Sequence, residues 1–148
     1  MPVFKHELLT TTPAEMDVIS TAIGDNTNQA RSDNDIGKAV KKGADQNYVL
    51  CADGDEIGGF IDSVRGDTVN GGYSFGGVQR RKRMWAEVGS GTVEVNDLVL
   101  AAAQVAFGTK GVAQVKAAGV TPPEVYKWQA IRVEGAGTVG SRVLLERE

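Results

Sequence analysis

The sequence predicts an all-β protein, either a β-sandwich or jelly roll or a β-barrel, with an N-terminal arm. Short apolar, β-branched or aromatic segments recur from Gly37 onward, and turn-forming pairs such as Asp53-Gly54 and Asn70-Gly71 separate them. In addition, 19 of the 148 residues are glycine, well above the average of about 7%. Short strands at this spacing are typical of sandwiches and barrels, whereas a βαβ enzyme core needs helices between its strands.

The first 36 residues are rich in Thr, Ser, Asn and Asp and are expected to form the arm. Thr12–Glu15 matches a capping box, which predicts a short helix that ends at Gly24. The β-branched residues of segment 18–23 favour a strand instead, so the arm is either extended or contains a short helix. An ordinary N-terminal strand plus a loop is an equally good interpretation. We expect a partner to order the arm by contacting its apolar residues, which are Phe4, Leu8, Leu9, Met16 and Ile19.

Residues 37–148 are expected to form one β domain. A hairpin is expected around Asp53-Gly54, because Asp-Gly readily adopts the positive φ of a tight turn. The segment Met84–Val88 alternates apolar or small residues with Trp and Glu, which predicts a strand with one buried face. The expected strands include Ala39-Val40, Tyr48–Ala52, Phe60–Val64, Gly71–Val78, Met84–Val88, Leu98–Ala103, Gly111–Val115, Trp128–Val133 and Val143–Leu145.

Charge and composition argue against several classes of partner. The net charge of −3 and the pI near 5.2 give the chain no bulk attraction for nucleic acid or anionic lipid. No segment approaches the ~20 apolar residues of a membrane helix, and the first residues lack the apolar core of a signal peptide. Cys51 is the only cysteine, so the chain forms no internal disulfide.

Motifs associated with catalysis or cofactors are incomplete. Gly135–Gly140 matches the GxGxxG fingerprint of dinucleotide-binding folds, but the eight residues after it are too few for that unit, so we expect a hairpin turn. His6 is the only histidine, and Cys51 is expected to be a small buried hydrophobic residue. The acidic clusters around Asp33 and Asp53 do not follow the order of an EF-hand. The sequence therefore predicts no catalytic residue, no cofactor and no metal site.

A run of four basic residues is the strongest local charge feature of this acidic chain. It consists of Arg80, Arg81, Lys82 and Arg83. One interpretation is contact with an acidic partner surface or with phosphates, and the other is a solvated strand end. No aromatic residues are interleaved with the run, so it offers no platform for stacking bases, and we expect no direct contact with nucleic acid.

Several segments resemble the head decoration, or cement, proteins of tailed bacteriophages. They are Gly37–Val40, Asn47–Phe60, Gly71–Val78, the strand around Trp85, and Lys127–Ser141. The likeness covers roughly residues 36–148. It implies a compact β-barrel or jelly roll that binds the outside of an assembled capsid and holds neighbouring major capsid protein subunits together, often as a dimer or trimer. The family offers no catalytic residues to transfer to this chain.

These observations lead us to expect a structural virion protein, and not an enzyme. It would be made in the cytoplasm of the host and would act on the outer surface of the capsid. Two other functions remain open on the residues alone. One is a soluble β-barrel module that binds carbohydrate or another small ligand, and the other is a hydrolase with an unrecognised pair of carboxylates.

Overall fold

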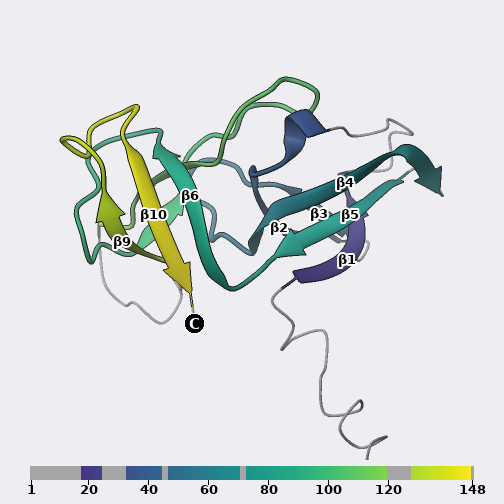
Figure 1. Ribbon diagram of the computed structural model, residues 1–148, viewed down its shortest axis with the longest axis horizontal. Helices are drawn as coiled ribbons and strands as arrows, with labels where there is room; N and C mark the ends of the chain where they lie inside the picture. The colour runs from purple at the N-terminus through teal and green to yellow at the C-terminus, as the bar shows by residue number, and fades with distance from the viewer. Residues whose placement is uncertain (1–17, 25–32, 45–46, 71–72, 120–127, 148) are drawn as a thin grey trace, which may run out of the picture.

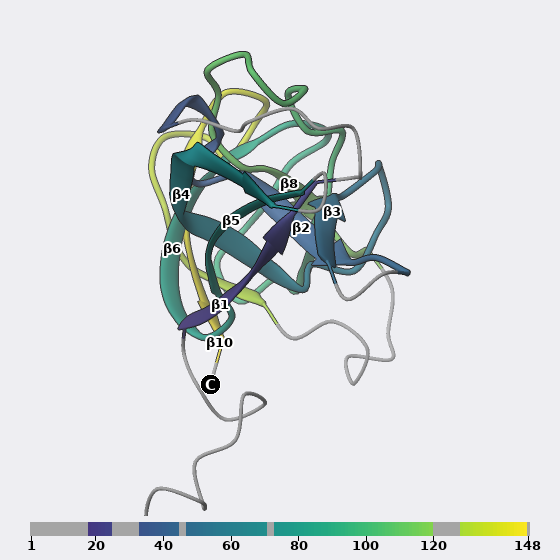
Figure 2. The ribbon, with the colours of Figure 1, turned by 90° about the vertical axis from the view of Figure 1, so that its right-hand side faces the viewer.

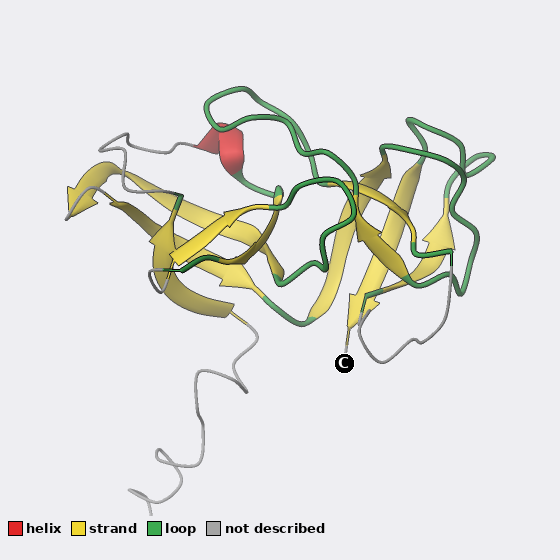
Figure 3. Cartoon of the chain, turned by 180° about the vertical axis from the view of Figure 1, so that it is seen from behind, coloured by secondary structure: helices red, strands yellow, loops and turns green. Residues whose placement is uncertain are grey.

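The computed structural model describes residues 18–24, 33–44, 47–70, 73–119 and 128–147, with the backbone alone described for 66–70 and 73. The described part of the chain forms a closed five-stranded barrel and a five-stranded sheet beside it (Figures 1 and 3). The expected all-β fold is confirmed. No helix in these residues is long and apolar enough to span a membrane.

The barrel has the strand order β1-β3-β2-β4-β5 and is turned toward the viewer in Figure 2. Strand β1 closes it, because β1 pairs in parallel with β3 and antiparallel with β5. A short 3-10 helix, η1 (Asp33–Asp35), precedes β2. The barrel strands are β1 (Val18–Ile23), β2 (Ala39–Lys42), β3 (Asn47–Leu50), β4 (Gly59–Asn70) and β5 (Tyr73–Gln79).

The prediction of a helix that ends at Gly24 is wrong for Val18–Ile23, and the alternative, a strand favoured by the β-branched residues, is confirmed, because these residues form β1. Ile19 and Ile23 contribute to the interior of the barrel, whereas Val18 and Ser20 are exposed. This alternation has the period of a strand, and burial of one face outweighs the local capping signal. Thr12–Glu15 lie outside the described residues.

The second sheet has the order β7-β8-β6-β10-β9. Its centre is the antiparallel pair β6–β10, in which Ala86 lies opposite Val143. Ala86, Val88, Val143 and Leu145 are buried, which confirms the one buried face expected for the segment that ends at Val88. The strands are β6 (Lys82–Val88), β7 (Val99–Ala101), β8 (Gln114–Ala117), β9 (Gln129–Val133) and β10 (Arg142–Arg147).

The strands expected at Leu98–Ala103 and Gly111–Val115 are shorter or shifted, because residues 102–113 form a loop between β7 and β8. In this loop the Gln104 side chain makes the hydrogen bonds to backbone groups that a neighbouring strand would make in a sheet. Its Oε1 accepts from the backbone N–H groups of Ala39 and Gln114, each at 3.2 Å, and its Nε2 donates to two carbonyl groups. Propensity and periodicity do not reveal such a side-chain bridge.

Strands β2 and β4 separate two apolar cores. Val40 and Ile61 point into the barrel, whereas their neighbours Ala39 and Phe60 belong to the larger core under the second sheet. Phe60 packs edge-on against Trp128, with ring centroids 4.8 Å apart. Because successive side chains of a strand point to opposite faces, these two strands fix the barrel and the second sheet to each other.

Candidate functional site

The basic run lies where the chain passes from the barrel to the second sheet. Strand β5 ends at Gln79 and β6 begins at Lys82, so Arg80 and Arg81 form the connection (Figure 1). At the far end of β10, Arg147 lies opposite Lys82 in the β6–β10 ladder. We call the resulting group the basic edge, which consists of Arg80, Arg81, Lys82, Arg83 and Arg147.

Hydrogen bonds from a neighbouring side chain stabilise the backbone turn of the basic edge. Lys82 has a φ of 73°, in the left-handed region that non-glycine residues seldom adopt. Gln79 stabilises the turn, since its Nε2 donates to the carbonyl oxygens of Arg81 at 3.0 Å and Arg83 at 2.9 Å. The basic side chains therefore extend from a hydrogen-bonded turn.

Like charges are concentrated at this edge. Burial lowers the pKa of Arg147, and repulsion from Arg80 and Arg81 lowers it further, while Glu56 acts in the opposite direction. Arg83 Nε donates to Glu146 Oε2 at 2.9 Å. Because clustered cations attract negative charge, an acidic partner surface would suit this edge.

An aromatic side chain extends the basic edge across the outer face of the second sheet. Trp85 is half-buried, and the guanidinium of Arg142 lies 4.3 Å from the centroid of its ring. Leu144, also half-buried, is directly opposite Trp85 in the ladder. Trp and Arg are the residues that most often dominate binding energy at protein interfaces. We call the basic edge together with Trp85, Arg142 and Leu144 the docking face.

The residues expected to contact a partner lie in different parts of the structure. The basic run is brought together with Arg147, which the sequence analysis did not include. Ile19 packs against the interior of the barrel, so its side chain serves the fold instead of being presented to a partner. The remaining expected contacts, Phe4, Leu8, Leu9 and Met16, lie outside the described residues.

Cys51, Asp53 and Asp55, which were weighed for chemistry, make structural contacts, and His6 lies outside the described residues. Cys51 is buried, as expected, and burial raises the pKa of its thiol to about 12. Asp55 pairs with Lys41 at 2.6 Å, and Asp53 pairs with Lys116 at 3.1 Å. Within the described ranges, no group of three or more His, Cys, Asp or Glu side chains could hold a metal ion.

The glycine-rich segment Gly135–Gly140 is a turn, as expected, and it joins the paired strands β9 and β10. Gly135, Gly137 and Gly140 have φ values of 81°, 76° and 93°. Glycine is the residue best suited to this conformation. The match to the dinucleotide fingerprint therefore reflects turn geometry.

Sequence reasoning missed a buried ion pair. Lys38 Nζ lies 2.7 Å from Asp35 Oδ1 and also donates to the carbonyl oxygens of Ala106 at 2.8 Å and Thr109 at 2.6 Å. Asp35 Oδ1 also accepts from the backbone N–H of Gly108 at 2.9 Å. The pair holds the loop of residues 102–113 against η1, and the two lie side by side in Figures 1 and 3.

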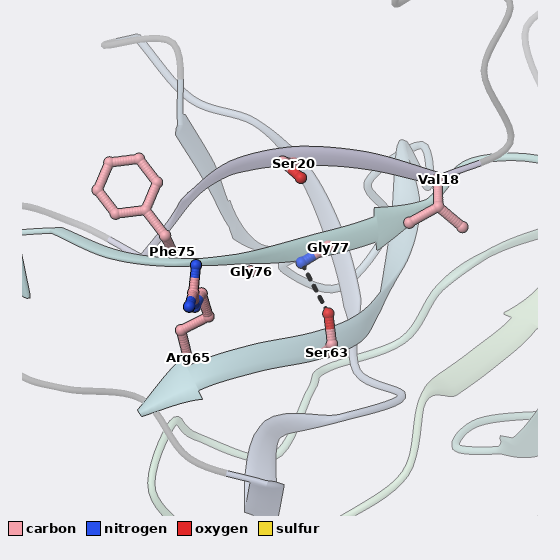
Figure 4. Close-up of a pocket in the computed structure, with 7 residues that line it drawn as sticks. All are labelled: Val18, Ser20, Ser63, Arg65, Phe75, Gly76 and Gly77. Carbon is pink, nitrogen blue, oxygen red and sulfur yellow. Dashed lines mark hydrogen bonds between the residues drawn. The ribbon is translucent and has the colours of Figure 1, made fainter. Parts of the chain in front are cut away.

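The outer side of the barrel carries a hollow of about 380 Å³ over strands β1, β5 and β4 (Figure 4). Its floor includes Gly76 and Gly77, and Ser20, Ser63, Arg65 and Phe75 surround it together with Val18. The sequence carried one signal for it, the glycine pair within β5, which indicates close approach or a missing side chain.

Comparisons of the chain with protein-family models, with curated proteins and with solved structures found no match.

Proposed function

We propose that this protein binds the outer surface of a tailed-phage capsid and stabilises the lattice of the major capsid protein. The proposal rests on the sequence resemblance to phage decoration proteins and on one structural observation, the docking face. In a chain with a net charge of −3, five basic residues gather at one edge and continue into a half-buried tryptophan. Such a surface suits an acidic protein partner with a pocket or ridge that covers an aromatic ring.

The two parts of the docking face would contribute differently to binding. The basic edge is partly exposed, so its charges would mainly accelerate association and make it sensitive to salt. Trp85 and Leu144 would supply apolar area that is removed from water in the complex, and burial of apolar area slows dissociation. Truncation of Trp85 and neutralisation of the basic edge should therefore have distinguishable kinetic effects.

Stabilisation of the shell would follow from mass action. A protein that binds the assembled lattice and not the free subunits shifts the equilibrium toward the assembled state. Contacts that are weak one by one become effective when an oligomer engages several subunits, because the second contact forms at high effective concentration. We therefore include self-association as a dimer or trimer in the proposal, with the assembled protein on the outside of the virion and synthesis in the host cytoplasm.

The test is co-sedimentation with empty capsids of the same phage, followed by heating of the decorated and undecorated shells. We expect saturable binding and a higher temperature of shell disruption with the protein bound. Trp85→Ala should weaken binding, whereas Val95→Ala, on a different exposed side chain, should not. Absence of saturable binding would contradict the proposal, and a glycan array and a hydrolase panel would then test the two other functions.

A further inference from the structure

The hollow on the barrel is built from two neighbouring cross-strand rows. In the first row, Gly77 of β5 lies between Ser20 of β1 and Ser63 of β4. In the second row, Phe75 lies between Ala22 and Arg65. Alternate residues of a strand share a face, so the two serines, the arginine and the aromatic ring all lie on the outer side of the barrel.

Gly77 creates the floor of the hollow. A Cβ at this position would lie 3.0 Å from Ser63 Oγ and 3.1 Å from a methyl group of Val18. The side chains of Ser63 and Val18 therefore lie close over the backbone of β5 at Gly77, and Asp62 Cβ is 3.8 Å from the same position. Because adjacent strands are about 4.8 Å apart, the two strands that carry the serines are separated by roughly 10 Å.

An irregularity in the β4–β5 pairing directs Ser63 into the hollow. The register shifts between Ile61 and Ser63, and the backbone N–H of Gly77 donates to Ser63 Oγ at 3.2 Å. This bond uses Ser63 as an acceptor and leaves its hydroxyl hydrogen able to donate to a ligand. Bulges of this kind often redirect a side chain beside a binding site.

Arg65 places a positive charge at the hollow. Figure 4 shows its side chain extending from β4 toward β5, beside Phe75. Within the described part of the chain, no hydrogen bond or ion pair involves this guanidinium, and the residue is exposed. A guanidinium is suited to bidentate binding of a carboxylate, serine hydroxyls both donate and accept, and an aromatic ring covers the apolar face of a sugar.

We propose that this hollow binds a sugar that carries a carboxylate, such as a uronic acid residue of an acidic glycan. The carboxylate would pair with Arg65, the ring hydroxyls would bond to Ser20 and Ser63, and one edge of the sugar would contact Phe75. A neutral sugar would leave the guanidinium unpaired. A phosphate monoester, with close to two negative charges, would be met by one cation. The volume of about 380 Å³ lies within the roughly 300–1,000 Å³ of ligand pockets.

The experiment is an NMR titration of the ¹⁵N-labelled full chain with methyl glucuronide, methyl glucoside and glucose 6-phosphate. We expect the amide of Gly77 to shift with glucuronide, with an affinity at least about tenfold above that for glucoside, the factor that corresponds to one charge-assisted contact of about 1.4 kcal/mol. Arg65→Met should remove this preference. Arg132→Met, which neutralises an exposed arginine outside the hollow, should retain it.

Equal affinity for the charged and neutral sugars, tighter binding of the phosphate, or an unchanged preference in Arg65→Met would overturn the proposal. So would the absence of any shift at Gly77. Ser20→Ala gives a second test on an exposed residue. It should lower the affinity for both sugars, and the affinity for glucuronide should stay above that for glucoside. None of these results bears on capsid binding, because the docking face lies on other strands.

Discussion

Lys38 Nζ and Asp35 Oδ1 are 2.7 Å apart, and both side chains are completely buried. The ammonium group has three donors, and the carboxylate of Asp35 and the carbonyl oxygens of Ala106 and Thr109 accept from them. A buried charge is tolerated only when it is paired and hydrogen-bonded. This pair therefore joins η1, the beginning of β2 and the loop of residues 102–113 into one unit.

Replacing Lys38 with Met should lower the free energy of unfolding by about 3–5 kcal/mol, because the buried carboxylate of Asp35 would lose the cation that balances its charge. Lys41→Met is the matched control. Lys41 pairs with Asp55, but its side chain is 41% exposed, and such a pair contributes no more than about 1 kcal/mol. Urea denaturation monitored by tryptophan fluorescence measures both variants. Equal destabilisation by the two substitutions would contradict the assigned role of Lys38.

Deletion of residues 2–23 should abolish cooperative folding of the barrel, whereas deletion of residues 2–17 should leave it intact. The longer deletion removes β1, which closes the barrel between β3 and β5. It also removes Ile23, which is fully buried. Near-ultraviolet circular dichroism and the urea m-value report the loss, since m scales with the surface exposed on unfolding. A longer deletion with an unchanged m-value would show that β1 is dispensable.

Stability should fall between about pH 9 and pH 12 through Cys51. Burial raises the pKa of this thiol from 9.0 to about 12, with the nearby Asp55 as a smaller cause. In the unfolded chain the thiol ionises at its ordinary pKa, so rising pH stabilises the unfolded state while the folded thiol stays protonated. Between pH 8 and pH 10 the wild type should lose about 1.4 kcal/mol more than Cys51→Ala. If the free energies of unfolding of the wild type and Cys51→Ala changed in parallel with pH, the thiol of the folded protein would be accessible to water.

Replacing Arg80, Arg81 and Arg83 with Ser should weaken capsid binding and flatten its dependence on ionic strength. Rim charges act mainly on the association rate. The comparison uses roughly 50 and 300 mM salt, a range over which the Debye length falls from above about 10 Å to below about 8 Å. The thermal midpoint should barely change, because Arg83 and Glu146 form an exposed pair.

The matched control for this variant replaces three exposed basic residues away from the basic edge, Lys42, Lys110 and Arg132. It changes the net charge by the same amount. Identical binding of both triple variants and the wild type at both salt concentrations would identify the basic edge as a solvated turn.

The sequence predicted several elements whose signals are local. The hairpin expected around Asp53-Gly54 is wrong, because β2 lies between β3 and β4 in the barrel and pairs with both. The alternation from Met84 to Val88 identified the buried face of β6, and the glycines from Gly135 to Gly140 identified a turn, because both signals lie within a few residues. The basic run was also visible, and the fold adds Arg147 to it across the β6–β10 ladder.

Contacts that join distant segments were not predictable in this way. Lys38 binds the carbonyl of Ala106, 68 residues away, and that of Thr109, 71 residues away. A lysine three residues after an aspartate has the ordinary appearance of a surface pair, so nothing local marks it as buried. The hollow likewise depends on three strands that are brought together by closure of the barrel. Serines on two of these strands become neighbours of Gly77 only in the folded state.

Electron cryomicroscopy of the phage capsid with and without this protein tests the proposed function most directly. We expect additional density on the outer surface at symmetry-related positions, fitted by the barrel and second sheet with Trp85 and the basic edge against the major capsid protein. Capsids that carry no added density at saturating protein, or density that contacts the shell with Trp85 and the basic edge facing solvent, would contradict the account.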